Sequence, residues 1–437
     1  MKTKLEESLK LQKKFNDIIP GGSHTYAKGD DQFPEFMPIY LEKGNGCHVW
    51  DVDGNEYIEY AMGLRSVTLG HNFAPVVEAA YKQMLKGTNF GRPSMIELEC
   101  AETFLGMFEN AEMVKFGKNG SDATNGALKI ARAYTGRDMV GICADHPFFS
   151  VDDWFISTTP MNSGIPRIMQ DLTAKFHYND LESIEKMFAE HPGEIACIIL
   201  EPEKYDPPKD DFLNKAKEIC HKNGALFILD EMITGFRWHN GGAQKVYNVD
   251  PDMSTFGKAM GNGFSISALA GKKEFMKLGG INHDKERVFL MSTTHGAESH
   301  VLAAAIATMK FYQENDVIGV LHEQGRKLKE GVNKASRELG IEDKVSIIGP
   351  DCCSVYTTRD NDGNPSQPFR TLFIQEQLKR GLLMPSSIVS YSHSDEDISE
   401  TVEKLHDAMI IYKKALNEGI DRYLSGRPVA PVWRKYN

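Results

Sequence analysis

The chain has 437 residues, of which 41% are hydrophobic and 25% charged, and its net charge is −11. This length exceeds what one hydrophobic core usually serves, so we expect a large domain and a smaller one. The negative charge argues against nucleic acid or an anionic membrane surface as the main partner. No apolar run reaches membrane-spanning length and the lysine-rich start lacks the apolar stretch of a signal peptide, so the expected location is the cytoplasm.

The N-terminal region contains a helix and a β-hairpin by its residue pattern. Leu5, Leu9 and Phe15 recur at roughly helical spacing, and Pro20-Gly21-Gly22 ends that helix. The stretch from Gly46 to Tyr60 alternates apolar and polar residues around Asp53-Gly54, as a hairpin does.

From about residue 75 to 310, short apolar runs alternate with amphipathic helices. Ile195–Leu200 is a buried strand, residues 213–221 form a helix ended by Gly224, and Ala225–Leu229 is the next strand. A strand, helix and strand at this spacing predict a right-handed crossover and a parallel sheet. Long helices return beyond about residue 315, the last with Ser394 as its N-cap.

These changes of pattern predict an α/β protein with two domains. Residues 75–314 form the large domain, whose mainly parallel sheet is flanked by helices. Residues 1–74 and 315–437, the two chain ends, build a smaller α+β domain. The seven cysteines lack a CxxC pair and are expected to be reduced and mostly buried, without a metal or a disulfide.

Three candidate site segments follow strands of the large domain. Ligands bind beyond the carboxyl ends of strands in open parallel sheets. The first segment, Gly117–Thr124, is a glycine turn before a helix with Ser121 as the expected N-cap, and such a helix start can bind a phosphate. Taken alone, it could equally be a plain strand–helix turn.

The other two segments hold an acid and a lysine. Asp230 ends the strand before Glu231, where a buried carboxylate needs a cation, although a cap or salt bridge would also explain it. Lys258 precedes a turn of small residues and could be a partly desolvated nucleophile or simply a solvated lysine. A phosphate cradle, a strand-end acid and a lysine in this order are what pyridoxal 5′-phosphate (PLP) chemistry requires. A nucleotide site is a poor alternative, since neither GxxxxGK[ST] nor a helix-opening GxGxxG occurs.

The sequence resembles the class III, fold-type-I PLP aminotransferases, and most closely their glutamate-1-semialdehyde aminomutase branch. The similarity covers most of the chain and is carried by Ile18–Gly22, Val49–Gly54, Leu69–His71, Gly120–Thr124, Ala131–Arg137, Asp230–Arg237, Gly257-Lys258 and Pro385-Ser386.

By that resemblance, Lys258 forms the Schiff base with PLP, Asp230 pairs with the pyridinium nitrogen and Met232 packs on the ring. An aromatic ring stacks on the pyridine, and Phe148 is the expected one, with Phe149 as the alternative. The resemblance also implies cofactor contacts from Gly120, Ser121, Asp122 and Thr124. It further implies a homodimer, in which Thr293 would reach the cofactor phosphate of the neighbouring subunit.

The substrate pocket departs from the aminomutase pattern. The arginine expected after Pro-Gly-Gly is missing from Ser23–Lys28, which contains Tyr26, and the glutamate expected after Pro-Ser falls at Val389. A tryptophan is replaced by Leu64 beside Arg65, and Arg92 replaces a small residue. Tyr26, Arg65 and Arg92 are therefore the candidate substrate residues, although both arginines could instead form surface salt bridges.

These features predict a transaminase that moves an amino group from an amino acid, by analogy L-glutamate, to an aldehyde or ketone. The resemblance suggests a sugar acceptor used for polysaccharides or aminoglycosides. The alternatives are glutamate-1-semialdehyde aminomutase activity and a catalytically silent PLP-fold binding protein. The presence of Lys258 and Asp230 disfavours the silent protein.

Overall fold

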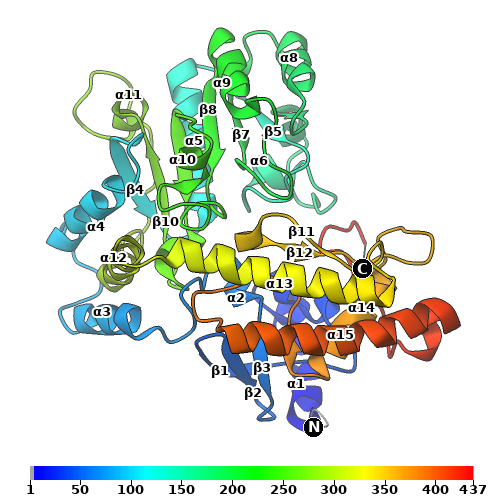
Figure 1. Ribbon diagram of the computed structural model, residues 1–437. Helices are drawn as coiled ribbons and strands as arrows, with labels where there is room; N and C mark the ends of the chain where they lie inside the picture. Colours follow the sequence, from blue (N-terminus) through cyan, green and yellow to red (C-terminus); the bar gives the residue numbers. More distant parts are fainter. Residues whose placement is uncertain (1–3, 437) are drawn as a thin grey trace. The chain divides into compact units, whose positions relative to one another are not determined.

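The computed structural model describes residues 4–436 and divides the chain into two compact units (Figure 1). One unit joins the two ends of the chain, up to Phe73 and from Gly319, and the other spans Ala74–Ile318. The boundaries expected from the sequence lie after residues 74 and 314.

A seven-stranded sheet with the order β4-β10-β9-β8-β7-β5-β6 forms the centre of the larger unit. Its strands are β4 (Met113–Gly117), β5 (Met139–Cys143), β6 (Thr173–Phe176), β7 (Ile195–Leu200), β8 (Leu226–Asp230), β9 (Met253–Phe256) and β10 (Ser267–Gly271). Strands β9, β8, β7, β5 and β6 are parallel, whereas β10 is antiparallel to both of its neighbours, β9 and β4. The mainly parallel sheet expected from the sequence is thus confirmed.

The helices of this unit are α3 (Ala74–Met84), α4 (Met95–Leu105), α5 (Gly120–Thr135), α6 (Asp153–Ile156), α7 (Ile168–Asp171), α8 (Leu181–Glu190), α9 (Phe212–Lys222), α10 (Gly242–Val246), α11 (Lys273–Met276) and α12 (Ser299–Glu314). Every residue of β7 and β8 is buried, because helices such as α5 and α9 pack against these strands. After α9, Gly224 has φ +69°, a left-handed conformation that glycine adopts without strain, and the chain enters β8.

The other unit contains a four-stranded sheet with the order β1-β2-β3-β13. Its elements are α1 (Glu6–Ile18), β1 (Leu41–Asn45), β2 (His48–Asp51), β3 (Glu56–Glu59), α2 (Met62–Arg65), α13 (Val317–Leu339, which begins in the larger unit), β11 (Ile347–Ile348), β12 (Val355–Tyr356), α14 (Gln367–Leu378), β13 (Leu382–Leu383) and α15 (Asp395–Glu418). The predicted hairpin is the antiparallel pair β2–β3, and β13 joins β3 in parallel, so this sheet ties the two chain ends together. Ser394 caps α15 as expected, with its hydroxyl accepting from the Asp397 backbone N–H.

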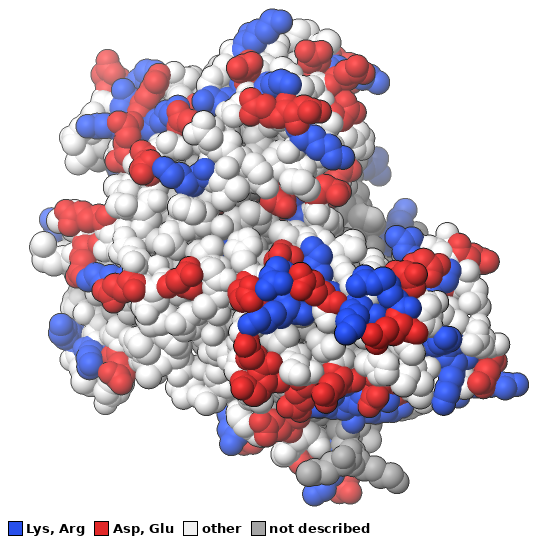
Figure 2. Space-filling view, viewed as in Figure 1, with Lys and Arg blue, Asp and Glu red and all other residues white. Residues whose placement is uncertain are grey.

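All seven cysteines are buried and none forms a disulfide. On the face shown in Figure 2, lysine and arginine side chains are interspersed with aspartate and glutamate. No helix within residues 4–436 is both long and apolar enough to cross a membrane.

Candidate active site

The three segments singled out in the sequence meet at one edge of the seven-stranded sheet. Two antiparallel steps separate β4 from β9, so β4 runs in the same direction as β9 and β8. The carboxyl ends of these three strands therefore share an edge. Gly117 ends β4, Asp230 ends β8 and Lys258 follows β9, which brings the glycine turn, the acid and the lysine to that edge.

The first segment is the start of α5. The prediction that Ser121 caps this helix is wrong: Asn119 is the N-cap, and Ser121 lies in the first turn. The Asp122 carboxylate turns back and accepts from the backbone N–H groups of Lys118 (2.8 Å) and Asn119 (2.9 Å). The helix start thus has its dipole end at the sheet edge, although the Asp122 side chain is engaged in capping.

The loop after β5 packs on this helix start. Thr124 Oγ1 donates to the carbonyl of Phe149 (3.1 Å), and the Val151 N–H donates to Ser121 Oγ (3.0 Å). As a result the two aromatic candidates differ sharply in environment: Phe149 is 2% exposed, whereas Phe148 is 45% exposed. Phe148 is the ring that a ligand could reach, and Phe149 belongs to the core.

Asp230 is a buried carboxylate beside the lysine. Its side chain is 2% exposed, and its Oδ1 accepts from Thr255 Oγ1 (2.9 Å) and the Met232 N–H (3.0 Å). Burial raises the pKa of Asp230, although the charge of Lys258 and these two hydrogen bonds oppose that rise. A further cation at Asp230 would stabilise its charged form.

Lys258 is held in an unusual backbone conformation. Its φ is +44°, in the left-handed region that residues with a Cβ rarely occupy, and its side chain is half-buried. Such a conformation carries about 1–3 kcal/mol of strain, and strained residues cluster at functional sites.

Met232 connects the three segments. A Cβ added at Gly120 would lie 3.0 Å from Met232 Sδ, and one added at Gly257 would lie 2.7 Å from the same atom. The thioether of Met232 therefore packs between the turn before α5 and the turn that carries Lys258. Met232 itself lies two residues after Asp230 in the sequence. Only glycine leaves room for this approach on both sides.

Comparison with known proteins identifies the family to which this edge of the sheet belongs. The family model described as aminotransferase class-III matches residues 26–409. The chain is 31% identical to the glutamate-1-semialdehyde 2,1-aminomutase of Persephonella marina over 92% of this chain and 98% of the relative. It is 30% identical to the 3-aminobutyryl-CoA aminotransferase of Cloacimonas acidaminovorans, over 95% and 99%. The PLP internal aldimine form of the Sphingopyxis sp. MTA144 FumI protein superposes with a TM-score of 0.85 at 27% identity, covering 97% and 98%.

The chain belongs to the class-III aminotransferases. It is accordingly a fold-type-I, PLP-dependent transaminase, as the resemblance implied. The residues present fit this cofactor: a helix start offers backbone N–H groups to a phosphate, a half-buried lysine offers an amine, and the buried Asp230 gains from a cation.

Two residues that contact these segments do not stand out in the sequence. Thr255 supports Asp230, and His146 Nδ1 accepts from the Glu201 backbone N–H (3.0 Å), which ties the Phe148 loop to the end of β7. Thr255 lies opposite Asp230 in the β8–β9 ladder. Its role follows from strand register, which composition and spacing alone do not give.

The remaining candidates lie elsewhere in the aminotransferase. Thr293 and Arg92 are exposed residues of the larger unit and line one cavity of about 670 Å³. Tyr26 and Arg65 belong to the other unit. Tyr26 is 59% exposed, and Arg65 ends the short left-handed turn Met62–Arg65, with φ +73°.

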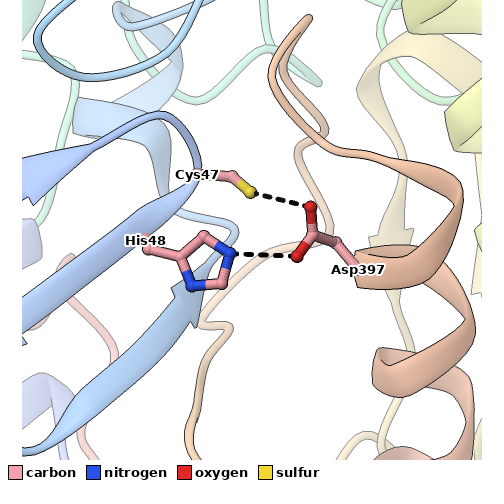
Figure 3. Close-up of side chains that lie close together, drawn as sticks. All are labelled: Cys47, His48 and Asp397. Atoms are coloured by element: carbon pink, nitrogen blue, oxygen red, sulfur yellow. Dashed lines mark hydrogen bonds and ion pairs between the residues drawn. The ribbon is translucent and has the colours of Figure 1, made fainter.

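A separate cluster lies in the unit built from the chain ends. Cys47 Sγ is 3.3 Å from Asp397 Oδ2, and His48 Nε2 is 3.0 Å from Asp397 Oδ1 (Figure 3). The same carboxylate accepts from the Ser394 N–H and hydroxyl at the start of α15. Burial opposes ionisation of Asp397, but these hydrogen bonds together lower its pKa. The cluster thus joins the start of β2 to a capped helix.

Proposed function

We propose that this class-III aminotransferase transfers an amino group from an amino-acid donor, by analogy L-glutamate, to an aldehyde or ketone that carries an anionic group. The observation that carries the proposal is that Lys258, Asp230 and the start of α5 lie at one edge of the sheet. The anionic group is inferred from Arg65 and Arg92, which depart from the aminomutase pattern. A sugar acid is one acceptor of this class, and a sugar acceptor stays a prediction.

The proposed residue roles follow from the contacts described above. Bound PLP supplies an electron sink for the substrate's Cα–H bond. Lys258 Nζ would hold the cofactor, and its free amine would remove and return the proton at the substrate's Cα. Asp230 would keep the ring nitrogen protonated, and Thr255 and the Met232 N–H hold Asp230 in place.

The other contacts position the cofactor. Gly120 and Ser121 offer backbone N–H groups to the phosphate, while the carboxylate of Asp122 and the hydroxyl of Thr124 shape this helix start. We assign Met232 and the exposed ring of Phe148 to packing against the pyridine ring. Thr293 is assigned to the neighbouring subunit's phosphate in a homodimer, and the enzyme is placed in the cytoplasm.

Arginine content supports an anionic substrate. A guanidinium group binds a carboxylate or phosphate through paired hydrogen bonds. We assign Arg65 and Arg92 to such contacts, and Tyr26 to contact with the substrate. The relative named 3-aminobutyryl-CoA aminotransferase is 30% identical to this chain, close to the 31% of an aminomutase, which supports a family range wide enough for a different acceptor.

The alternative is the aminomutase reaction, favoured by the names of several relatives. Single-turnover experiments separate the two. A transaminase should release about one equivalent of 2-oxoglutarate per subunit from L-glutamate without any acceptor, whereas an aminomutase should rearrange glutamate-1-semialdehyde without releasing a keto acid. Failure to release any keto acid from glutamate, alanine or another donor would contradict the transaminase proposal.

Lys258→Ala tests the assignment of the lysine. Borohydride reduction of the wild-type protein with PLP, followed by mass spectrometry of peptides, should find the cofactor on Lys258. The variant should lose both this adduct and nearly all turnover while its unfolding curve stays close to wild type. A variant with normal turnover would refute the assignment. Sedimentation with and without PLP tests the homodimer, which a fully active monomer would contradict.

A further inference from the structure

Three side chains of different metal-binding chemistry lie together in the unit built from the chain ends. Cys47 Sγ is 3.3 Å from Asp397 Oδ2, His48 Nε2 is 3.0 Å from Asp397 Oδ1, and one ligand atom from each residue lies within 4.8 Å of the other two. The three side chains point toward one another (Figure 3). The cysteine spacing alone favours no metal, because Asp397 lies 350 residues after Cys47 in the sequence.

Both ring nitrogens of His48 face carboxylates. Its Nδ1 is 2.9 Å from Glu56 Oε1, and its Nε2 is 3.0 Å from Asp397 Oδ1. A neutral imidazole has only one N–H, so one of these carboxylates would face a lone pair. The cluster therefore requires a positive charge, which is either the imidazolium of His48 or a metal ion on Nε2. With a metal ion, Nδ1 keeps its proton for Glu56, as metal-binding histidines usually do with a carboxylate.

The other two side chains favour the metal ion. Asp397 Oδ2 accepts from the Ser394 N–H (2.9 Å) and hydroxyl (2.8 Å), whereas His48 is the hydrogen-bond partner of Oδ1 among the described residues. Burial and the charge of Asp397 raise the pKa of the Cys47 thiol, so without a metal the sulfur keeps its proton. One thiolate and one carboxylate would neutralise a divalent cation, which lowers the cost of holding it beside a buried sulfur.

The distances suit a tetrahedral zinc site. Zinc binds sulfur at about 2.3 Å and nitrogen or oxygen at about 2.0–2.2 Å, which places neighbouring ligand atoms roughly 3.3–3.6 Å apart. The two distances at Asp397 are close to this range, so shifts of about 1 Å would complete the arrangement. A sulfur and a nitrogen ligand suit Zn²⁺ better than Mg²⁺ or Ca²⁺, which prefer oxygen. His48 is partly exposed, so water can occupy the fourth position.

We propose that Cys47, His48 and Asp397 bind a zinc-type divalent metal ion, and that Glu56 orients His48 for this contact. On binding, the S–H bond of Cys47 breaks, its proton passes to the solvent and a metal–sulfur bond forms. The metal ion then links the hairpin of β1 and β2 to the start of α15 and stabilises this unit. Lys258 belongs to the other unit, and the inference does not depend on the proposed transamination.

Cobalt identifies the ligands spectroscopically. The PLP-loaded protein is dialysed against a chelator and titrated with Co²⁺, whose visible bands are intense in tetrahedral sites and whose bonds to thiolate absorb in the near ultraviolet. Wild type should gain these bands up to about one Co²⁺ per subunit, and Zn²⁺ should abolish them. Cys47→Ala should lack them. Cys353→Ala is the matched control, because Cys353 is a buried cysteine of the same unit outside any such cluster among the described residues.

Zinc affinity and thermal unfolding test the roles of Glu56 and of the metal ion. Glu56→Gln leaves the three ligands in place, so the cobalt spectrum should keep its shape while competition with a chromophoric chelator shows about ten- to a hundredfold weaker Zn²⁺ binding. Its unfolding temperature without metal should match wild type. Added Zn²⁺ should raise the unfolding temperature of wild type but not that of Cys47→Ala.

The outcomes separate this inference from the proposed function. Cobalt bands that persist in Cys47→Ala, or a wild-type protein without such bands, would overturn the metal site and leave the transaminase proposal intact. Should Cys47→Ala fail to fold, His48→Gln at the partly exposed ligand provides the same test. Zinc that binds without raising the unfolding temperature would refute the linking role. Absence of transamination in a protein with normal cobalt bands would refute the proposed function alone.

Discussion

Asp230→Asn is the substitution that isolates charge at the proposed cofactor site. Both hydrogen bonds to Asp230 reach the same oxygen, from Thr255 Oγ1 at 2.9 Å and the Met232 N–H at 3.0 Å. An asparagine can place its carbonyl oxygen there and keep both donors. The change therefore removes the negative charge with little change in shape or hydrogen bonding.

Asp230→Asn should leave the stability of the cofactor-free protein intact but weaken the binding of PLP. Without PLP, burial disfavours the charge and raises the pKa of Asp230, so the asparagine variant should be as stable as wild type or slightly more stable. With PLP, the variant loses a charge-assisted hydrogen bond to the ring nitrogen, worth about 1.5–3 kcal/mol. That corresponds to roughly ten- to a hundredfold weaker binding, and turnover should fall further because the ring nitrogen is no longer held protonated.

Equilibrium titration of PLP and thermal unfolding of the cofactor-free protein measure both effects. Thr255→Val is the matched control, because it removes one hydrogen bond to the carboxylate but leaves the charge, and its loss of affinity should be smaller. A wild-type dissociation constant in Asp230→Asn would refute the pairing with the ring nitrogen. A large fall in the unfolding temperature of the cofactor-free variant would show that Asp230 is mainly structural.

Two further predictions concern the loop after β5. Burial, assisted by Lys204, lowers the pKa of His146 to about 3, below its unfolded value of about 6.5. The contribution of neutral His146 to the free energy of unfolding is therefore complete above pH 6.5 and falls by up to about 5 kcal/mol as the pH falls toward 3. In urea unfolding from pH 4 to 8, the free energy of unfolding should depend less on pH in His146→Asn than in wild type. The same pH dependence in both proteins would contradict this prediction. Phe149→Ala should lose about 3–5 kcal/mol of stability because the ring is 2% exposed. Phe148→Ala should lose under about 1 kcal/mol yet bind PLP more weakly, and equal effects of the two on PLP binding would remove the distinction.

Much of this arrangement follows from local sequence patterns. Buried apolar runs and amphipathic helices predict the β7–α9–β8 unit, and a rule of parallel sheets places the ends of β8 and β9 at one edge. The N-cap of α5 is Asn119 and not the predicted Ser121, although the sequence contains the signal, since Asn119 with Asp122 three residues later is a capping box. Serine and asparagine cap helices about equally well, so residue type alone does not decide between Asn119 and Ser121.

Other features depend on contacts between segments far apart in the sequence. Strand β10 lies between β4 and β9 and is antiparallel to both, which sets the direction of β4. No local sequence pattern predicts this strand order. The pairing of Thr255 with Asp230 depends on the register of β8 and β9. The cavity lined by Arg92 and Thr293 likewise joins residues near 90, 115, 129 and 293, whose proximity only the folded chain reveals.

The packing of Met232 between two glycines makes a last prediction about coupling. Gly257 has an extended backbone, so alanine there meets no φ penalty, but its Cβ would lie 2.7 Å from Met232 Sδ. Gly257→Ala must therefore displace the thioether, at about 1–3 kcal/mol of stability, and with it the turn that carries Lys258. Met232→Ala removes the obstructing atoms, so in the double variant the alanine at 257 should cost much less. A double-mutant cycle on unfolding free energy and on the PLP dissociation constant should give a coupling of about 0.5–3 kcal/mol. Additive effects would show that Met232 and the lysine turn do not depend on each other, and that another contact of Gly257, such as the Ile266 carbonyl 3.3 Å from the added Cβ, governs the response.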